Sequence, residues 1–234
     1  MDSTLRRRFL TLTAAHVADG CLRAGVPVRC APPRVRPLLP GARVGGRVLP
    51  ARHAGSVDVF LEAFEHAEPG DVLVVDNGGR EDEACVGDLV VLEAREAGVS
   101  GLVVWGLHRD TADLREIGWP LFSTGSLPTG PLRLDARDPE ALLSARVGPW
   151  TVTSADVVLG DEDGVLFVPG AALAEVFTAA ERIRDTERGQ AKRISQGRTL
   201  REQVGFAGYL SARAAEPALT FREHLRRVGG AIEE

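Results

Sequence analysis

The sequence predicts an α/β fold organised around a βαβ unit, and three segments carry this prediction. Residues 71–76 (DVLVVD) and 101–105 (GLVVW) are short, continuously apolar runs, which are typical of strands covered on both faces. Between them, residues 87–97 carry apolar side chains at helical spacing, and Gly98 can end that helix. Strand, helix and strand in this order form a βαβ unit whose two strands are parallel.

The other segments extend this unit into a single compact domain with mixed β-sheets. The proline-rich stretch 27–40 predicts edge strands and turns, because proline has no N–H for a central strand. The remaining elements are expected in chain order as a helix over 4–19, a strand over 41–49, a short helix over 56–66, strands near 121–123, 145–147 and 165–168, and helices over 171–193 and 198–234. We expect a catalytic domain over 1–204 and a C-terminal helical arm over 205–234, which belongs to the same domain or contacts another subunit.

Composition excludes several classes of protein. The 234 residues are 44% hydrophobic and 26% charged, which is ordinary for a globular protein. The net charge of −5 gives no general attraction to nucleic acid or to acidic membranes. No run approaches the ~18 apolar residues of a membrane helix. The three cysteines have no zinc or redox spacing, and the sequence contains no phosphate-loop or dinucleotide fingerprint. We expect a cytoplasmic protein.

The βαβ unit brings distant polar residues together. Asp88 begins the predicted helix, and Arg109-Asp110 follow the second strand, so all three should meet at the carboxyl edge of the sheet, where α/β proteins bind ligands. A helix N-terminus favours a bound carboxylate, and Gly87 lets a ligand approach the backbone closely. Arg109 offers a planar fork for an anion, and the two aspartates are hard ligands for Mg²⁺ or Mn²⁺. Such a set suits the stabilisation of an enolate.

Simpler explanations of the same residues remain open at this point. Asp110 could cap a short helix that follows it, and Asp88 could cap its own helix. Arg109 could form a surface ion pair. Residues 161–164 (DEDG) could belong to a calcium loop, but a turn before an apolar strand is favoured because the full spacing is missing. His108 is a candidate proton donor or substrate contact.

At these residues the sequence resembles the RraA-like family, which includes the regulator of ribonuclease activity A and the 4-hydroxy-4-methyl-2-oxoglutarate aldolases. The family carries an aspartate, twenty further residues and then Arg-Asp, which correspond here to Asp88 and Arg109-Asp110. The similarity covers about residues 10–204, and its other matching motifs are VVDNGG at 74–79, CVGDL at 85–89, GLVVWGLHRD at 101–110 and GDEDGVLFVP at 160–169.

The resemblance implies a fold of the swivelling phosphohistidine-domain type, assembled as a homotrimer or hexamer. It implies that pyruvate binds Arg109 and the backbone at the start of the helix, namely Gly87, Asp88, Leu89 and Val90. Asp110 would ligate the metal, and Asp88 would hold metal-bound waters. A neighbouring subunit would add an acidic residue from its C-terminal helix, for which Asp185 and Glu187 are candidates.

The implied activity is that of a class II, metal-dependent pyruvate aldolase or oxaloacetate decarboxylase. Its substrate is a small 2-keto acid, its cofactor is a divalent cation (Mg²⁺ or Mn²⁺), and Arg109, Asp88 and Asp110 are its catalytic residues. Lys192 is the only lysine, which favours a metal route over an imine route. A non-enzymatic regulator that binds a ribonuclease or helicase is the alternative. A structural oligomer would leave the Asp88 and Arg109-Asp110 cluster without a purpose.

Overall fold

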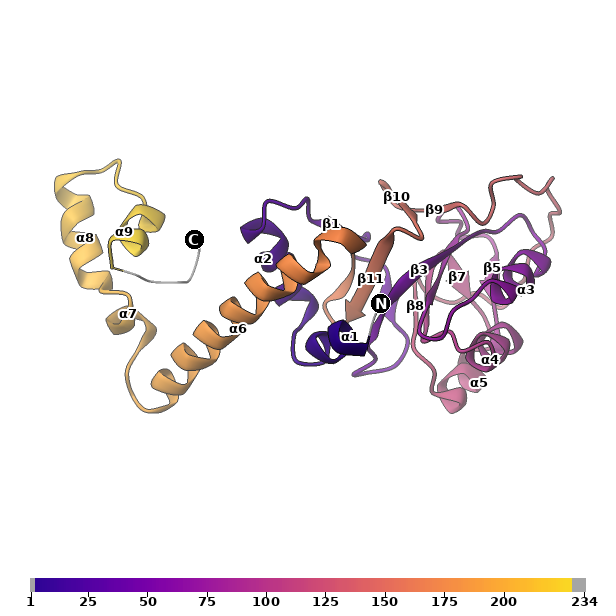
Figure 1. Ribbon diagram of the computed structural model, residues 1–234, viewed down its shortest axis with the longest axis horizontal. Coiled ribbons are helices and arrows are strands. Elements are labelled where there is room, and N and C mark those ends of the chain that lie inside the picture. Colours follow the sequence, from indigo (N-terminus) through magenta and orange to yellow (C-terminus); the bar gives the residue numbers. More distant parts are fainter. Residues whose placement is uncertain (1–2, 229–234) are drawn as a thin grey trace.

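The computed structural model describes residues 3–228 as a mixed α/β domain from which one long helix carries a small helical arm (Figure 1). Its helices are α1 (Ser3–Phe9), α2 (Ala14–Arg23), α3 (Asp58–Glu65), α4 (Asp88–Glu96), α5 (Thr111–Ile117), α6 (Leu173–Ser195), α7 (Leu200–Gln203), α8 (Phe206–Ala215) and α9 (Phe221–Val228). Its strands are β1 (Arg29–Cys30), β2 (Arg36–Pro37), β3 (Val44–Arg52), β4 (Val72–Asp76), β5 (Ala84–Val86), β6 (Leu102–Trp105), β7 (Leu107–His108), β8 (Leu121–Ser123), β9 (Ser144–Val147), β10 (Trp150–Thr153), β11 (Asp156–Asp161) and β12 (Gly164–Pro169).

The predicted βαβ unit is confirmed. β4 and β6 are adjacent and parallel, with Leu73 opposite Leu102 and Asp76 opposite Trp105, and α4 lies between them in the chain. Gly98, with φ 78°, follows α4 as predicted. Both strands are buried on both faces, which is why they lack the polar alternation of a half-exposed strand.

The main sheet has eight strands in the order β1-β12-β11-β3-β4-β6-β8-β2. The long strand β3 joins its two halves, since Val44–Arg47 pairs antiparallel with β11 whereas Val48–Arg52 pairs parallel with β4. The two edge strands, β1 and β2, lie in the proline-rich stretch that predicted edges and are only a short turn apart in the chain. The sheet is therefore mixed and curled.

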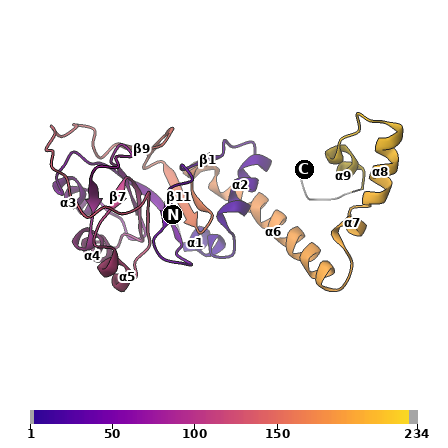
Figure 2. The same cartoon turned by 180° about the vertical axis from the view of Figure 1, so that it is seen from behind.

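Three apolar clusters hold the layers together. Helices α3, α4 and α5 cover one face of β4 and β6, where Phe60, Val91 and Leu114 pack against Leu73 and Val75. On the opposite face the β9–β10 hairpin closes a second cluster, which contains Val72 and Val74 of β4. A third cluster packs α1, α2 and α6 on β11 and β12 (Figure 2). Alternate residues of one strand thus serve different clusters, as the strand period of two requires.

The prediction of one helix over residues 4–19 is wrong. The chain forms α1 and then α2, because Thr13 caps α2 and its hydroxyl accepts a hydrogen bond from the backbone N–H of His16 at 3.2 Å. The structure also contains strands that were not predicted, among them β11 and the parallel pair β5–β7. Residues 161–164 form the turn between β11 and β12, as favoured, with Asp161 opposite Gly164.

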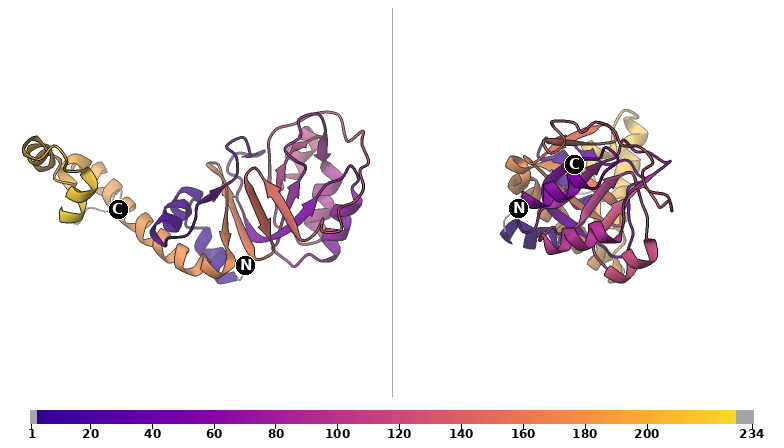
Figure 3. Two further views of the ribbon diagram at one scale, coloured as in Figure 1. Left: turned by 90° about the horizontal axis from the view of Figure 1, so that it is seen from above. Right: turned by 90° about the vertical axis from the view of Figure 1, so that its right-hand side faces the viewer.

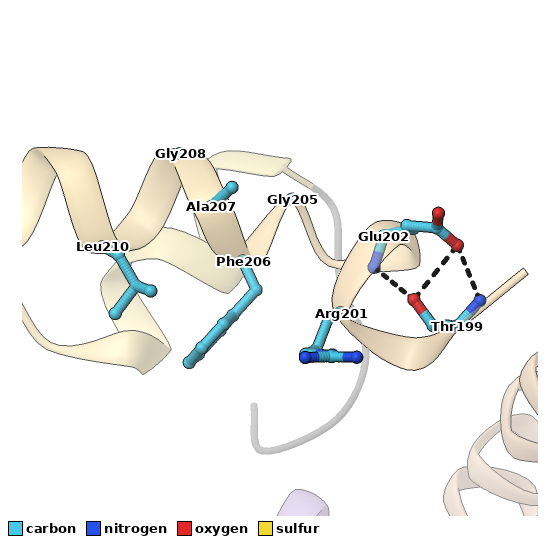
Figure 4. Close-up of a pocket in the computed structure, with 8 residues that line it drawn as sticks. All are labelled: Thr199, Arg201, Glu202, Gly205, Phe206, Ala207, Gly208 and Leu210. Atoms are coloured by element: carbon cyan, nitrogen blue, oxygen red, sulfur yellow. Dashed lines mark hydrogen bonds between the residues drawn. The ribbon is translucent and has the colours of Figure 1, made fainter.

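The C-terminal segment is helical, as predicted, over its described part, and residues 229–234 lie outside the described residues. α6 leaves the domain, and α7, α8 and α9 gather at its far end (Figures 1 and 3). They form their own aromatic cluster, in which the ring centroids of Tyr209 and Phe221 lie 5.0 Å apart. A groove of about 590 Å³ runs along α7 and α8 and is lined partly by Phe206 and Leu210 (Figure 4). Within residues 3–228, no helix has the length and apolar character needed to cross a membrane.

Candidate active site

The parallel strands β5 and β7 bring the predicted site residues together. Ala84 lies opposite Leu107, and Val86 lies opposite His108. The backbone N–H of Arg109 donates to the carbonyl of Val86 at 2.9 Å. The chain after β5 enters α4 and the chain after β7 enters α5, so both helix starts lie beside each other. The predicted meeting of Asp88 with Arg109-Asp110 therefore depends on this second, two-stranded sheet and not only on β4 and β6.

Gly87 is in direct contact with the Arg109-Asp110 pair. A Cβ built on Gly87 would lie 2.3 Å from Oδ2 of Asp110 and 3.4 Å from Nε of Arg109. The Asp110 carboxylate therefore occupies the space that any side chain at position 87 would need. Arg109 Nε lies 3.4 Å from the same Oδ2. A carboxylate, a guanidinium and the first turn of α4 thus converge on one bare stretch of backbone.

Asp110 has a strained backbone. Its φ is 57° and its ψ is 40°, and it is the only non-glycine residue with positive φ among residues 3–228. The left-handed conformation costs an L-residue about 1–2 kcal/mol, although aspartate tolerates it better than most. Strain of this kind concentrates at functional sites. Here the turn directs the Asp110 carboxylate toward Gly87.

The start of α4 has the features of an anion site. Gly87 is the N-cap in an extended conformation, and Asp88 is the first helical residue. The first N–H groups of a helix have no partners within the helix, and its N-terminal end is electropositive. One of the predicted binding amides is already engaged, because Leu89 N–H donates to Oδ1 of Asp88 at 2.8 Å. The Leu89 side chain is 74% exposed.

Of the three simpler explanations, the structure bears out the ion pair of Arg109 but neither helix cap. Asp110 occupies the N-cap position of α5, but its side chain makes no capping hydrogen bond. Asp88 bonds only the next residue's N–H, and Gly87 holds the N-cap position of α4. Arg109 does form an ion pair with Asp110, with the two side chains 49% and 35% exposed. Neither aspartate is accounted for as an ordinary cap.

His108 lies beneath the site and does not line it. It is 4% exposed, its Nδ1 lies 2.7 Å from Ser123 Oγ, and its Nε2 lies 3.2 Å from Thr111 Oγ1. Burial is the main reason that its pKa lies below the ordinary histidine value. Both ring nitrogens are engaged, so the side chain braces β7 against its neighbours.

Sequence reasoning missed the segment that crosses this site after β8. The backbone of Gly130 lies against Arg109, since a Cβ on Gly130 would be 2.7 Å from Nη1 of Arg109. Beside it lies a buried polar cluster in which Arg133 contacts Glu83 and Asn77. The segment has no apolar period and no motif, so nothing in the sequence pointed to it.

Within residues 3–228, no group of three or more histidine, cysteine or acidic side chains is arranged to hold a metal ion. Two aspartates lie at this stretch of backbone: Asp110, whose carboxylate contacts Gly87, and Asp88, the first residue of α4. Asp185 and Glu187 lie on α6, at the opposite end of the domain from α4 and α5 (Figures 1 and 2). Their side chains are 66% and 51% exposed.

Comparison with known proteins identifies relatives of this chain. The chain is 27% identical over 207 residues to Protein DlpA of Legionella pneumophila, a match that covers 85% of this chain but only 33% of DlpA. It is 36% identical over 143 residues to a Halorhodospira halophila protein provisionally named 4-hydroxy-4-methyl-2-oxoglutarate aldolase, covering 56% of this chain and 82% of the relative.

A solved structure from Streptomyces coelicolor has the same fold. It is RraAS2, described as an unusual member of the RNase ES inhibitor RraA protein family. The two superpose with a TM-score of 0.70 at 26% identity, over 82% of this chain and 98% of that one. The RraA-like family, described as Aldolase/RraA, matches residues 14–167, which include every residue of the site from Gly87 to Asp110. The chain therefore belongs to the RraA-like family.

Proposed function

We propose that the chain is a divalent-metal-dependent lyase that acts on small 2-keto acids. It would cleave a C–C bond of a 4-hydroxy-2-oxo acid, of the 4-hydroxy-4-methyl-2-oxoglutarate type, or decarboxylate oxaloacetate, in each case through the enolate of pyruvate. The observation that carries the proposal is the contact of the Asp110 carboxylate and the Arg109 guanidinium with bare backbone at Gly87. The aldolase name of the Halorhodospira halophila relative agrees with it.

The anion-binding half of the site follows from its local geometry. The substrate's carboxylate would lie at the N-terminus of α4, against the backbone of Gly87 to Val90, where the helix end favours negative charge. Arg109 would face the 2-keto oxygen and stabilise the negative charge that grows there as the C–C bond breaks. Its half-exposed guanidinium is accessible to a ligand from solvent.

The donor set fits a hard divalent cation. Asp110 offers carboxylate oxygens directly beside Gly87, and Asp88, the first residue of α4, would bind waters of the metal's shell. Mg²⁺ commonly retains several waters and needs only one or two protein carboxylates, so two aspartates are a sufficient set. When bound, the cation would supply Lewis-acid polarisation of the 2-keto group.

The bond changes are those of a retro-aldol cleavage. The 4-hydroxyl loses a proton, the bond between C3 and C4 breaks, and its electron pair passes into the enolate of pyruvate. A proton added to C3 then completes the product. For oxaloacetate the leaving group is carbon dioxide. Lys192, the only lysine, is exposed on α6 at the opposite end of the domain from α4, which favours the metal route over an imine route (Figure 1).

The assembly also belongs to this proposal. We expect a homotrimer or hexamer of the swivelling phosphohistidine-domain fold, in which an acidic side chain on α6 of one copy approaches the site of the next. Asp185 and Glu187 are exposed on α6 and support this arrangement. Sedimentation velocity on the full chain would measure the number of copies directly.

The test is pyruvate release from oxaloacetate and from 4-hydroxy-4-methyl-2-oxoglutarate, with Mg²⁺ or Mn²⁺ and again after EDTA. We expect activity that requires metal and falls by about 10²-fold or more in Arg109→Ala and Asp110→Ala. Asp113→Ala, an exposed carboxylate on α5, is the matched control and should keep native activity. Turnover no faster than that of free metal on both substrates would reject the lyase.

A regulator that binds a ribonuclease is the second candidate, and one observation favours it. The Streptomyces coelicolor relative belongs by its description to a family of ribonuclease inhibitors. If the native chain is inactive on both keto acids, inhibition of a purified ribonuclease E-type enzyme becomes the measurement of choice.

A further inference from the structure

The segment between β8 and β9 is attached by its backbone to both strands that carry the site. His108 N–H donates to the carbonyl of Gly125 at 3.0 Å, and Leu127 N–H donates to the carbonyl of His108 at 2.9 Å. Ala84 N–H donates to the carbonyl of Thr129 at 2.9 Å. We call residues 125–135 the site loop. Its first half therefore extends the β5–β7 pair.

The site loop then passes directly against Arg109. A Cβ on Gly130 would lie 2.7 Å from Nη1 and 3.6 Å from Cζ of Arg109, so the loop backbone forms a wall beside the guanidinium. The φ of Gly130 lies outside the left-handed region, so an alanine there meets no backbone strain. The added methyl would instead push the guanidinium aside.

The second half of the loop is fixed by a buried ion pair. Arg133 Nη2 donates to Oε1 of Glu83 at 2.9 Å, and Nε lies 3.1 Å and 3.2 Å from the two Glu83 oxygens. The Glu83 side chain is only 4% exposed. Arg133 also donates to Oδ1 of Asn77 at 3.0 Å, and that oxygen lies 2.9 Å from Nδ1 of His53. Two residues further on, Asp135 N–H donates to the carbonyl of Ala54.

A buried charge pair of this kind is a strong geometric constraint. A forked guanidinium that bonds both oxygens of a carboxylate fixes direction as well as distance. Arg80 Nε also lies 3.5 Å from Oε1 of Glu83, but Arg133 is the partner of Glu83 that belongs to the site loop, so loss of its fork releases the loop from this carboxylate. Glu83 directly precedes β5, and the same pair thus ties the loop to the strand that leads to Gly87 and Asp88.

We propose that Arg133 and Glu83 are a positioning pair for Arg109. They fix the position of the site loop, so that Gly130 holds the Arg109 guanidinium toward the anion site. Neither residue touches the substrate. The inference rests on the proposed function for its effect on catalysis, but the seating of Arg109 can be measured without turnover.

Two variants test the pair from different sides. Arg133→Lys keeps the charge but loses the fork, and Gly130→Ala displaces the guanidinium while the pair stays intact. Arg137→Lys is the control for the first, because Arg137 lies on the same stretch and forms an exposed ion pair with Glu62. Gly208→Ala is the control for the second, because a Cβ there meets nothing within 4 Å.

The first readout is the rate at which phenylglyoxal modifies Arg109, followed by peptide mass spectrometry. We expect the Arg109 rate to change by about fivefold or more in Arg133→Lys and Gly130→Ala, the size expected when a contact of about 1 kcal/mol is lost. The second readout is the division between kcat and KM for oxaloacetate. Partial unfolding would lower kcat and leave KM unchanged. A displaced guanidinium loses its contact with the 2-keto oxygen of the bound substrate as well as with the growing charge, so it lowers kcat and also raises KM, by about fivefold on the same scale.

The outcomes separate the two proposals. The native chain could turn over no keto acid, while the Arg109 modification rate changes in Arg133→Lys and Gly130→Ala but not in the two controls. That result would reject the lyase and support the positioning pair. Native activity, with KM and Arg109 reactivity in both variants equal to those of Arg137→Lys and Gly208→Ala, would overturn the positioning pair. A rise in KM in both variants, with no change in either control, supports it.

Discussion

The strained backbone of Asp110 allows stability to be separated from activity at a single position. With φ 57° and ψ 40°, this residue holds a conformation that glycine adopts freely. Asp110→Gly removes the strain, and Asp110→Ala retains it without the polar side chain that helps aspartate to tolerate it. Both substitutions remove the carboxylate that we propose as the metal ligand.

The difference between the two variants can be estimated from the structure. The left-handed conformation costs alanine about 1–2 kcal/mol, and the greater freedom of glycine in the unfolded chain takes back about 0.4–1 kcal/mol. The ion pair with Arg109 is lost in both variants and cancels. Asp110→Gly should therefore be about 1 kcal/mol more stable than Asp110→Ala, which corresponds to about 2–4 °C in Tm for a chain of this size.

Urea unfolding in EDTA measures this difference, because chelation removes any stabilisation by bound metal. Asp113, in the first turn of α5, supplies a control of opposite sign. In a right-handed helix, Asp113→Gly should be less stable than Asp113→Ala by up to about 1 kcal/mol. Both Asp110 variants should be inactive in pyruvate release. If Asp110→Ala is as stable as Asp110→Gly, the strain argument fails, and activity in either variant would remove Asp110 from the metal site.

Three further predictions concern the rest of the chain. Gly87→Ala puts a methyl 2.3 Å from Oδ2 of Asp110, so pyruvate release should fall about 10²-fold. The free energy of unfolding in urea should fall by about 1–3 kcal/mol. Native activity in this variant would contradict the close contact. Burial lowers the pKa of His53, so its contribution to stability is present above the unfolded pKa of about 6.5 and is lost as pH falls below it. His53→Gln should flatten the loss of unfolding free energy below pH 6.5 by up to about 1.4 kcal/mol per pH unit, as measured by urea unfolding at several pH values. Removal of residues 198–234 should shift the Tm by less than about 4 °C by circular dichroism, because the arm packs on its own aromatic cluster, and a larger shift would show that the arm supports the domain.

The sequence determined the central unit of the fold because its signals are local. Continuous apolar runs at 72–76 and 102–105 specify buried strands, and the stripe of α4 with Gly98 behind it specifies the helix between them. From that topology Asp88 and Arg109-Asp110 could be expected at one edge, although it is the β5–β7 pair that brings the starts of α4 and α5 together. The motif spacing then identified the family.

Only the tertiary structure decided the elements whose causes are contacts between distant residues. The chain divides at Leu10–Thr13 because Thr13 caps α2 and α1 packs separately on α6, which no periodicity reveals. Strands β5 and β7 are too short to carry a pattern, and they exist because they pair with each other. The left-handed turn at Asp110 could not be predicted, because the residue that usually signals a positive φ is glycine and this position holds aspartate.

The same distinction applies to the site. Its charged residues could be named from the sequence, since residue type and spacing along the chain reflect the chemistry they perform. The contacts that hold Arg109 could not be predicted from the sequence. Gly130, Arg133 and Glu83 lie far from it in the chain and act through a loop without regular structure. A buried ion pair and a close backbone contact join residues that are distant in the sequence, so only the folded chain determines which way the guanidinium faces.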